Sequence, residues 1–326
     1  MATKRGFLES VACAAVVAIG AIQASPAQAQ GKNVVYITPS LNVPFWRYVA
    51  TGVEAGAKAG GYTVTTLDSN NDGGTQLKNA QDAIAKKVAG IVLSPTDSST
   101  APSVLELAEK ANIPVVICDI GTTRGTHVSF ISSDNLTGAR GIGDAAAAAL
   151  KQKGWLTGSY GIVAIPQARK NGQLRTEGFR AAMKAAGVSK EVPMQQMKTF
   201  TPDESFRFAQ DMLTANPDLR LIFVEADTQA LAVARAVKAA RRDDQVLVAA
   251  FDGTPDLLKA IEDGTIVGSG MQQPYLMGSM AAKSLASKLS GGNPPREEMV
   301  EIMTVTKETA ASKAAQIKQN VFANNP

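Results

Sequence analysis

The sequence predicts an α/β protein made of two successive doubly wound halves. Short β-rich apolar runs alternate with longer helical runs along most of the chain, the alternation restarts after residues 128–131, and no linker-like stretch separates the two sets. Near-continuous apolar strands are typical of a parallel sheet covered on both faces, and short crossovers imply right-handed βαβ units. Two lobes joined by short crossings, the first at 132–134, are therefore expected.

The first half consists of valine- and isoleucine-rich strands separated by runs with helical periodicity. The expected elements are strand 33–38, helix 45–59, strand 62–67, helix 74–87, strand 90–93, helix 104–111, strand 114–117 and strand 128–131.

The second half repeats the pattern, beginning with an alanine-rich helix. The expected elements are helix 135–153, strand 159–165, helix 172–186, a strand near 194–199, helix 203–215, strand 219–225, helix 228–240 and strand 245–251.

The N-terminus has the pattern of a cleaved secretory signal. Lys4 and Arg5 precede a mostly apolar stretch at 7–22, and small residues at 25–29 suit cleavage after Ala29. A membrane anchor is the alternative, but the apolar stretch is shorter than the roughly 20 residues that a spanning helix needs. Residues 1–29 are therefore expected to be a signal peptide, and the mature chain to be periplasmic.

Composition excludes several classes of site. The formal net charge is +4 and is spread without a basic block, which argues against nucleic-acid binding. Cys118 is the one cysteine left after removal of the signal, so no intramolecular disulfide is expected. One cysteine and one histidine, His127, serve zinc poorly. No metal and no cofactor are expected, because no glycine-rich phosphate turn follows the strands at the required spacing.

The residues that directly follow each strand are the candidates for a binding site. In open parallel sheets, ligands bind beyond the carboxyl ends of the strands. These positions are 40–46, 68–72, 94–97, 119–120, 165–173, 200, 225–227 and 252.

Two kinds of side chain at these positions suit a hydroxylated ligand. Phe45 and Trp46 follow the first strand, where an aromatic ring can pack on the apolar face of a sugar, although adjacent aromatics at a helix start are ordinarily core. Asp119 and Asp252 each end an apolar strand, and a carboxylate accepts two strong hydrogen bonds from hydroxyls. Helix capping is the alternative for both aspartates, most of all for Asp252.

Several motifs in order along the chain carry a resemblance to a known family. They are 41–46 (LNVPFW), 67–71 (LDSNN), 94–98 (SPTDS), 133–135 (SDN) and 251–256 (FDGTPD). With these motifs the chain resembles the ribose-binding-protein family of periplasmic type I solute-binding proteins, from about residue 33 to 272 and beyond.

The resemblance implies two Rossmann-like lobes joined by three crossings, with a sugar or polyol held in the cleft and passed to an ABC-type permease. The lobes would comprise residues 30–133 plus 273–301 and residues 134–272 plus 302–326, with the third crossing near 301–304. By position, it implies stacking aromatics, hydroxyl-binding carboxylates and a hinge glutamine. The full set of expected ligand-binding residues is Phe45, Trp46, Asp119, Gln173, Arg175, Phe200, Asp227, Asp252 and Gln272.

The chain also departs from the family pattern at four pocket positions. Ile120, Gln173, Ala226 and Val43 stand where sugar binders of this family carry an arginine or an asparagine, and each change removes a hydrogen-bond donor. Arg169, Asn171 and Arg175 lie near enough in sequence to compensate. The lost donors favour a polyol, a deoxy sugar or another less oxygenated neutral ligand over ribose. An amine-bearing ligand is the alternative, since cations pair with carboxylates and aromatic faces.

The same sequence gives less support to other functions. A lone histidine with no paired nucleophile motif argues against an enzyme, and a sugar-responsive transcription regulator would need an N-terminal DNA-binding module. A binding protein that signals to a membrane sensor or chemoreceptor is compatible with transport. The expected protein is thus a monomeric, non-enzymatic solute-binding protein of an ABC-type importer.

Overall fold

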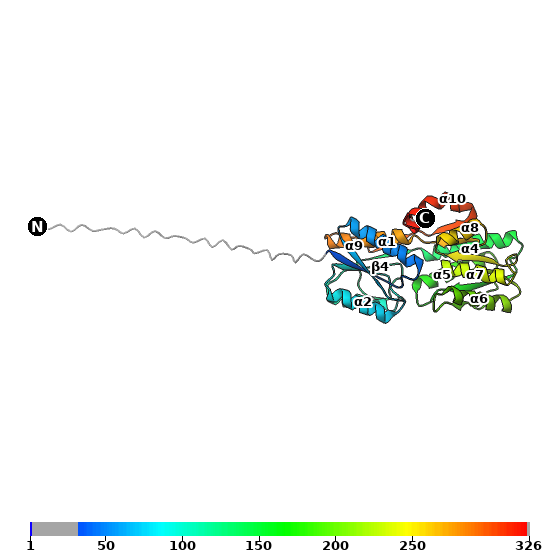
Figure 1. Cartoon of the computed structure of the whole chain (residues 1–326), viewed down its shortest axis with the longest axis horizontal. Coiled ribbons are helices and arrows are strands. Elements are labelled where there is room, and N and C mark those ends of the chain that lie inside the picture. Colours follow the sequence, from blue (N-terminus) through cyan, green and yellow to red (C-terminus); the bar gives the residue numbers. More distant parts are fainter. Residues whose placement is uncertain (2–31, 325–326) are drawn as a thin grey trace. The chain divides into compact units, whose positions relative to one another are not determined.

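The computed structural model describes Met1 and residues 32–324, in which the strands form two six-stranded sheets. The expected signal peptide and its cleavage point lie outside the described residues. Within the described part of the chain, no helix is long and apolar enough to cross a bilayer. The two sheets, each flanked by helices, confirm the predicted fold class (Figure 1).

The first sheet is parallel throughout and has the strand order β11-β5-β4-β3-β1-β2. Its strands are β1 (Asn33–Thr38), β2 (Thr63–Asp68), β3 (Gly90–Leu93), β4 (Val115–Cys118), β5 (Ser129–Ser133) and β11 (Glu297–Val300). The helices that accompany it are α1 (Pro44–Ala59), α2 (Gly73–Ala85), α3 (Ala101–Lys110) and α9 (Pro274–Leu289). The central strands β3 and β4 are buried at every position, as their apolar sequences require.

The second sheet has the order β12-β10-β9-β8-β6-β7 and is parallel except for β12, which runs antiparallel to β10. Its strands are β6 (Ser159–Ala164), β7 (Gln195–Gln196), β8 (Leu219–Val224), β9 (Leu247–Phe251), β10 (Gly268–Met271) and β12 (Met303–Thr306). The accompanying helices are α4 (Asn135–Gln152), α5 (Lys170–Ala185), α6 (Pro202–Ala215), α7 (Asp227–Ala239), α8 (Pro255–Glu262), α10 (Lys307–Gln316) and the π-helix η1 (Ile317–Val321).

The chain passes between the two sheets three times. It crosses after β5, where Asp134 caps α4 by accepting a hydrogen bond from the backbone N–H of Thr137, then between β10 and α9, and again between β11 and β12. The second and third crossings are tied together, because the side-chain amide of Gln273 donates to the carbonyl of Glu301 at 2.8 Å. The lobe boundaries expected at 133, 272 and 301 stay a prediction.

One predicted strand is shorter than expected. The strand near 194–199 forms only as β7, two residues paired with the edge of β6. Immediately beyond it, the backbone N–H groups of Lys198, Thr199 and Phe200 donate to the carboxylate of Glu204, on the first turn of α6. Because this carboxylate satisfies donors that a longer ladder would use, the backbone is free to turn, and Phe200 has a left-handed φ of 57°.

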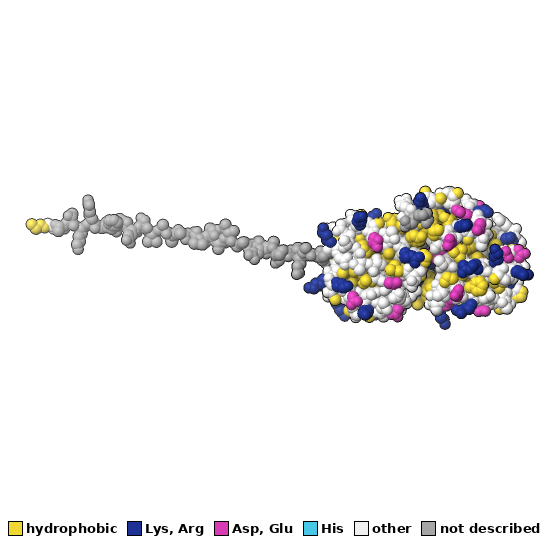
Figure 2. Space-filling model, viewed as in Figure 1, with side chains coloured by type: hydrophobic (Ala, Val, Ile, Leu, Met, Phe, Trp, Pro, Cys, Tyr) yellow, Lys and Arg dark blue, Asp and Glu magenta, His cyan; other side chains and the backbone are white. Residues whose placement is uncertain are grey.

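Charges of both signs are scattered over the face of the molecule that Figure 2 shows, without a block of either sign. This agrees with the even distribution of basic residues along the sequence.

Candidate functional site

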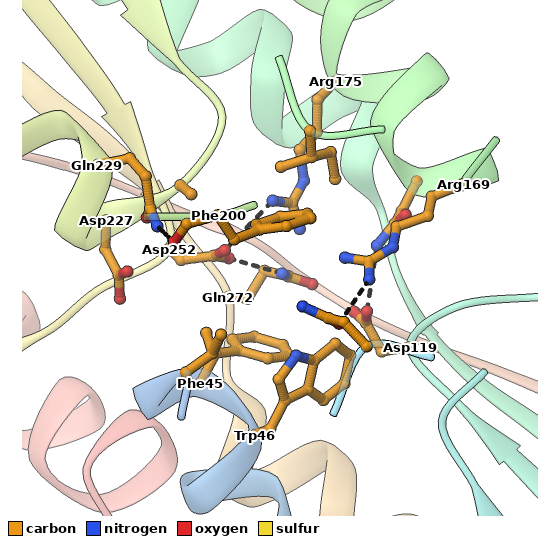
Figure 3. A pocket seen from close by; sticks show the side chains of 15 residues that line it. Phe45, Trp46, Asp119, Arg169, Arg175, Phe200, Asp227, Gln229, Asp252 and Gln272 are labelled. Carbon is orange, nitrogen blue, oxygen red and sulfur yellow. Dashed lines mark hydrogen bonds and ion pairs between the residues drawn. The ribbon is translucent and has the colours of Figure 1, made fainter. Parts of the chain in front are cut away.

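The candidate site is a pocket between the carboxyl ends of the two sheets. The space between its side chains, open solvent included, is about 490 Å³. Both lobes contribute, and Figure 3 shows the lining side chains converging on one space. The lining residues are Val43, Phe45, Trp46, Asn71, Asp119, Ile165, Arg169, Asn171, Arg175, Phe200, Ala226, Asp227, Gln229, Asp252 and Gln272.

Asp119 and Asp252 occupy equivalent places in the two sheets, directly after β4 and β9. Both have left-handed backbones, with φ of 70° and 65°, and each backbone N–H donates across to a neighbouring strand, to Ile131 and to Gly270. Such backbones are costly for residues with a side chain, and they cluster at functional sites. Asn71 and Phe200, which also line the pocket, share this conformation.

The capping alternative for Asp252 is wrong. The residue that caps α8 is Thr254, whose hydroxyl accepts from the backbone N–H of Leu257. The carboxylate of Asp252 instead accepts from Gln272 at 2.6 Å and from Arg175 at 3.2 Å, both of which line the pocket.

The aromatic residues lie on two sides of the space (Figure 3). Phe45 and Trp46 stand at the start of α1, after Pro44, with ring centroids 4.8 Å apart and planes at 90°. They line the pocket and also belong to the core of the first lobe, so the core interpretation and the site interpretation both hold. Phe200 comes from the second lobe, and the side chain of Gln229 fixes its carbonyl by a 2.6 Å hydrogen bond.

Arg175, on α5, is held from several sides. Its Nε donates to Asn135, and its Nη1 donates to the carbonyl of Glu225 as well as to Asp252. The guanidinium also lies 4.1 Å from the ring centre of Phe251. Arg175 is therefore a fixed positive charge whose donors are largely committed to the protein.

The segment 169–171, at the start of α5, connects the second lobe to the first. Arg169 donates to the carbonyl of Thr96 at 2.9 Å and to the side chain of Asn71 at 3.3 Å. The Asn171 amide donates to Asp119 at 3.1 Å. These hydrogen bonds join loops of one lobe to a helix start of the other, so the structure has its cleft closed.

Burial changes the protonation of the pocket carboxyls. Loss of hydration raises the pKa of Asp119 to about 6 and, together with the negative charge of Asp252, raises that of Asp227 to about 7. Burial likewise raises the pKa of Glu225 to about 7, although its carboxylate accepts hydrogen bonds from Thr176 and from the backbone of Ile165. Burial also lowers the pKa of the Arg169 guanidinium to about 10.

The pocket brings together all of the predicted site residues except Gln173. Gln173 is exposed on α5, and its amide donates to the carbonyl of Gln167, so its placement in the site is corrected. The physical reason is helical geometry: α5 turns its face with Asn171 and Arg175 inward and carries Gln173 outward. That the other residues contact the ligand stays a prediction.

The pocket is also richer in donors than the sequence alone indicated. Arg169, Asn171 and Arg175 all line it, in place of donors lost at Ile120, Gln173, Ala226 and Val43, although the donors that these side chains are seen to use are committed to protein acceptors. Two further polar residues were not among the predicted ligand contacts. Asn71 follows a strand end, a position that the sequence reveals, whereas Gln229 lies inside α7 and carries no such signal.

No group of three or more histidine, cysteine, aspartate or glutamate side chains in the described residues is arranged to hold a metal ion.

Comparison with known proteins gives a consistent result. A family model described as a periplasmic binding protein domain matches residues 34–293. The chain is 31% identical to the ribose import binding protein RbsB of Escherichia coli over 292 residues, covering 90% of this chain and 96% of that protein. It is 30% identical to the D-apiose import binding protein of Paraburkholderia graminis, covering 86% and 90% of the two chains.

Solved structures share the fold. A carbohydrate transporter solute-binding protein from Agrobacterium radiobacter, in complex with D-arabinose, superposes with a TM-score of 0.82 at 24% identity, covering 90% of this chain and all of the other. A solute-binding protein from Bacillus halodurans with bound myo-inositol gives 0.78 at 21% identity, covering 88% and 99%.

Proposed function

The chain belongs to the periplasmic binding protein family, and we propose on that premise that it is the substrate-binding component of an ABC-type importer for a sugar or a polyol. It is a binding protein and not an enzyme. The ribose and apiose import proteins that it resembles, and the structural relatives with bound arabinose and inositol, support this ligand class.

One observation carries the proposal: aromatic faces and carboxylates from both lobes meet in one closed pocket. Phe45 and Trp46 lie against one side and Phe200 against another, with Asp119 and Asp252 at the strand ends. A sugar or polyol has apolar C–H faces for the rings and hydroxyl donors for the carboxylates.

Binding of the ligand would stabilise the closed arrangement. A ligand that contacts side chains from both lobes has more contacts in the closed form than in an open one, so it shifts the population toward closure. The three crossings are the places where such a motion would pivot. The closed shape is what a permease would recognise, and a chemoreceptor could recognise the same shape.

The location and the assembly state complete the proposal. The family is periplasmic, and residues 1–29 would direct export as a cleaved signal. The mature protein would act as a monomer that meets its permease transiently.

The test is a thermal-shift panel. The mature chain from Gln30 onward is melted alone and with D-ribose, D-arabinose, D-allose, myo-inositol and glycerol. A ligand at about a thousand times its Kd stabilises the native state by roughly 4 kcal/mol, which raises the melting temperature clearly. A rise with at least one compound that is abolished in Asp252→Ala is expected; a rise that Asp252→Ala leaves unchanged would contradict the site.

A further inference from the structure

Three buried acceptor atoms of the pocket are without a partner. Asp119 Oδ1, Asp227 Oδ2 and Gln272 Oε1 are inaccessible to water and find no hydrogen-bond partner among residues 1 and 32–324. The three side chains line the pocket. A buried acceptor that stays unpaired is costly, so a ligand that fills this space has to supply donors.

The two arginines of the pocket do not supply these donors. Arg175 is committed to Asn135, the Glu225 carbonyl and Asp252, and Arg169 to the Thr96 carbonyl and Asn71. Within the described chain, the ion pair between Arg175 and Asp252 is the one salt bridge formed by pocket residues. The guanidinium groups thus hold neighbouring protein groups in place and leave the three unpaired oxygens of Asp119, Asp227 and Gln272 without donors.

The formal charges of the pocket do not balance either. Three carboxyls, those of Asp119, Asp227 and Asp252, line it against the two guanidinium groups of Arg169 and Arg175. Glu225, fully buried behind Arg175, adds a fourth acidic group. Burial raises the pKa values of Asp119, Asp227 and Glu225, and a cationic ligand placed among them would stabilise their ionised forms.

Among the pocket carboxylates, that of Asp227 has its negative charge least balanced by neighbouring protein groups. Asp227 is 2% exposed and is the first residue of α7, where its Oδ1 accepts from the backbone N–H of Thr228 at 2.6 Å. The position at the helix start explains the role of Oδ1. The other oxygen, Oδ2, is buried without a hydrogen-bond partner, and Asp227 lines the pocket. No lysine or arginine in the described residues forms a salt bridge with Asp227, in contrast to Asp252.

The surroundings of Asp227 suit a cation. Figure 3 places Asp227 and Asp252 toward one end of the space and Asp119 with Arg169 toward the other. An ammonium group at the first end would face two carboxylates and the aromatic side chains, which attract cations. The other end would still offer Asp119 to a hydroxyl.

From this juxtaposition we propose that the ligand is a sugar or polyol that carries a protonated amino group, and that Asp227 binds this group. The inference rests on the proposed function and narrows its ligand class. Asp227 would then determine specificity, distinguishing an amino derivative from its hydroxyl parent.

The test compares matched ligand pairs by isothermal titration calorimetry at pH 7. The pairs are D-glucose with D-glucosamine, sorbitol with 1-amino-1-deoxysorbitol, and glycerol with 2-amino-1,3-propanediol. At least one amine should bind about 100-fold more tightly than its parent, in line with the loss measured when a buried charged pair is broken. Neutral members that bind as tightly as the amines, or a panel in which no amine binds, would overturn the inference. Binding of a neutral member would at the same time uphold the proposed function.

The second arm assigns the charge to one residue. Asp227→Asn keeps the size of the side chain and the oxygen that caps Thr228, but removes the charge. It should weaken binding of the amine about 100-fold and so erase the preference for the amine over its neutral parent. Asp256→Asn, which removes an exposed carboxylate from the first turn of α8, is the matched control and should change nothing.

An amine that binds wild type and Asp227→Asn equally would overturn the assignment. If Asp227→Asn does not fold, as judged by its melting transition, Asp227→Ser takes its place, since serine also accepts at a helix start.

Discussion

At the residue scale, Asp252 holds the pocket together. Its side chain accepts from Arg175 of α5 and from Gln272 at the second crossing, and its carbonyl accepts from the hydroxyl of Ser269 on β10. A single carboxylate therefore orients one wall of the pocket and one of the segments on which the lobes pivot. Asp252 also lines the pocket.

Removal of Asp252 should harm both stability and binding. Asp252→Ala leaves the buried Arg175 without its ion pair, so the free energy of unfolding should fall by about 3 kcal/mol in urea titration. Ligand affinity should fall more than about tenfold in calorimetry at a temperature where the variant is folded. The exposed Asp256→Ala should show neither effect, and a stable Asp252→Ala with full affinity would contradict the assignment.

The raised pKa values of buried acids predict how stability depends on pH. The pKa of Asp227 is raised from 3.8 to about 7 and that of Glu225 from 4.5 to about 7. The folded state thus holds protons that the unfolded state has released, so stability is greatest below about pH 4 for these groups and is lost as pH rises through about 7. Asp227 faces Asp252 and Arg175 within its lobe and Tyr48 from α1; Glu225 faces Thr176, Arg175 and Arg180.

We therefore expect these groups to lower the melting temperature of the protein as the pH rises from about 4 to about 7, with no further decline from them above that. Asp227→Asn and Glu225→Gln should each make the decline shallower, because the amide does not titrate. Melting curves in steps of half a pH unit measure this. A variant that keeps the full slope would show that its residue does not contribute.

Site residues that follow a strand could be predicted from the sequence, whereas those placed by the orientation of a helix could not. Asp119 and Asp252 follow apolar strands, and strand ends are visible in sequence. Arg169 and Gln173 lie on the same short segment, and only the helical phase of α5, which starts at Lys170, turns one inward and the other outward. That phase depends on tertiary packing rather than on local composition.

At the element scale, the contact between α1 and α9 positions the aromatic wall. The two helices approach so closely that a Cβ on Gly52 would overlap the carbonyl of Tyr275, and one on Gly278 would overlap the carbonyl of Val49. Phe45 and Trp46 lie in the first turn of α1, and α9 begins directly after the crossing at Gln272 and Gln273. Helix spacing here therefore affects the pocket.

A methyl group at this contact should be costly. Gly278→Ala has to push α1 and α9 apart, so we expect a loss of about 1–3 kcal/mol of unfolding free energy together with weaker ligand binding. Gly74→Ala, on α2, is the matched control, because the nearest atom to its added Cβ is the end of the Asp72 side chain at 3.3 Å. That variant should be neutral or slightly stabilised. Equal effects in the two variants would contradict the role of the contact.

Two strands that the sequence did not reveal, β10 and β11, are short and lack a hydrophobic period. β10 (Gly268–Met271) contains two glycines, and β11 (Glu297–Val300) begins with two glutamates. These strands exist because neighbouring strands pair with them, β9 and β12 in one sheet and β5 in the other. The long alternating elements, by contrast, matched prediction to within a few residues, since their apolar pattern itself determines them.

At the scale of the whole molecule, the start of α5 links the two lobes. The hydrogen bonds from Arg169 to Thr96 and Asn71 favour the closed form before a ligand adds its own contacts. Their strength sets how much of the free protein is already closed.

Removal of this link should open the ligand-free protein. Arg169→Ala is expected to have a larger radius of gyration than wild type in small-angle X-ray scattering. Arg180→Ala is the control from the same helix, since Arg180 pairs with Glu191 inside the second lobe and should leave the radius unchanged. An Arg169→Ala protein as compact as wild type would show that these contacts do not hold the cleft closed.

The three crossings also determine the order in which the protein can fold. The second sheet takes five of its six strands from residues 159–271, whereas the first sheet needs β1 to β5 and then β11, and α1 needs α9 from more than 200 residues later. Contacts so distant in sequence form slowly, because a long loop has to close first. In a chain that is made or exported from its N-terminus, the lobe formed by the first hundred or so mature residues thus cannot complete its fold until about the last sixty residues are available. For much of its biogenesis, half of the binding pocket depends on the tail of the chain.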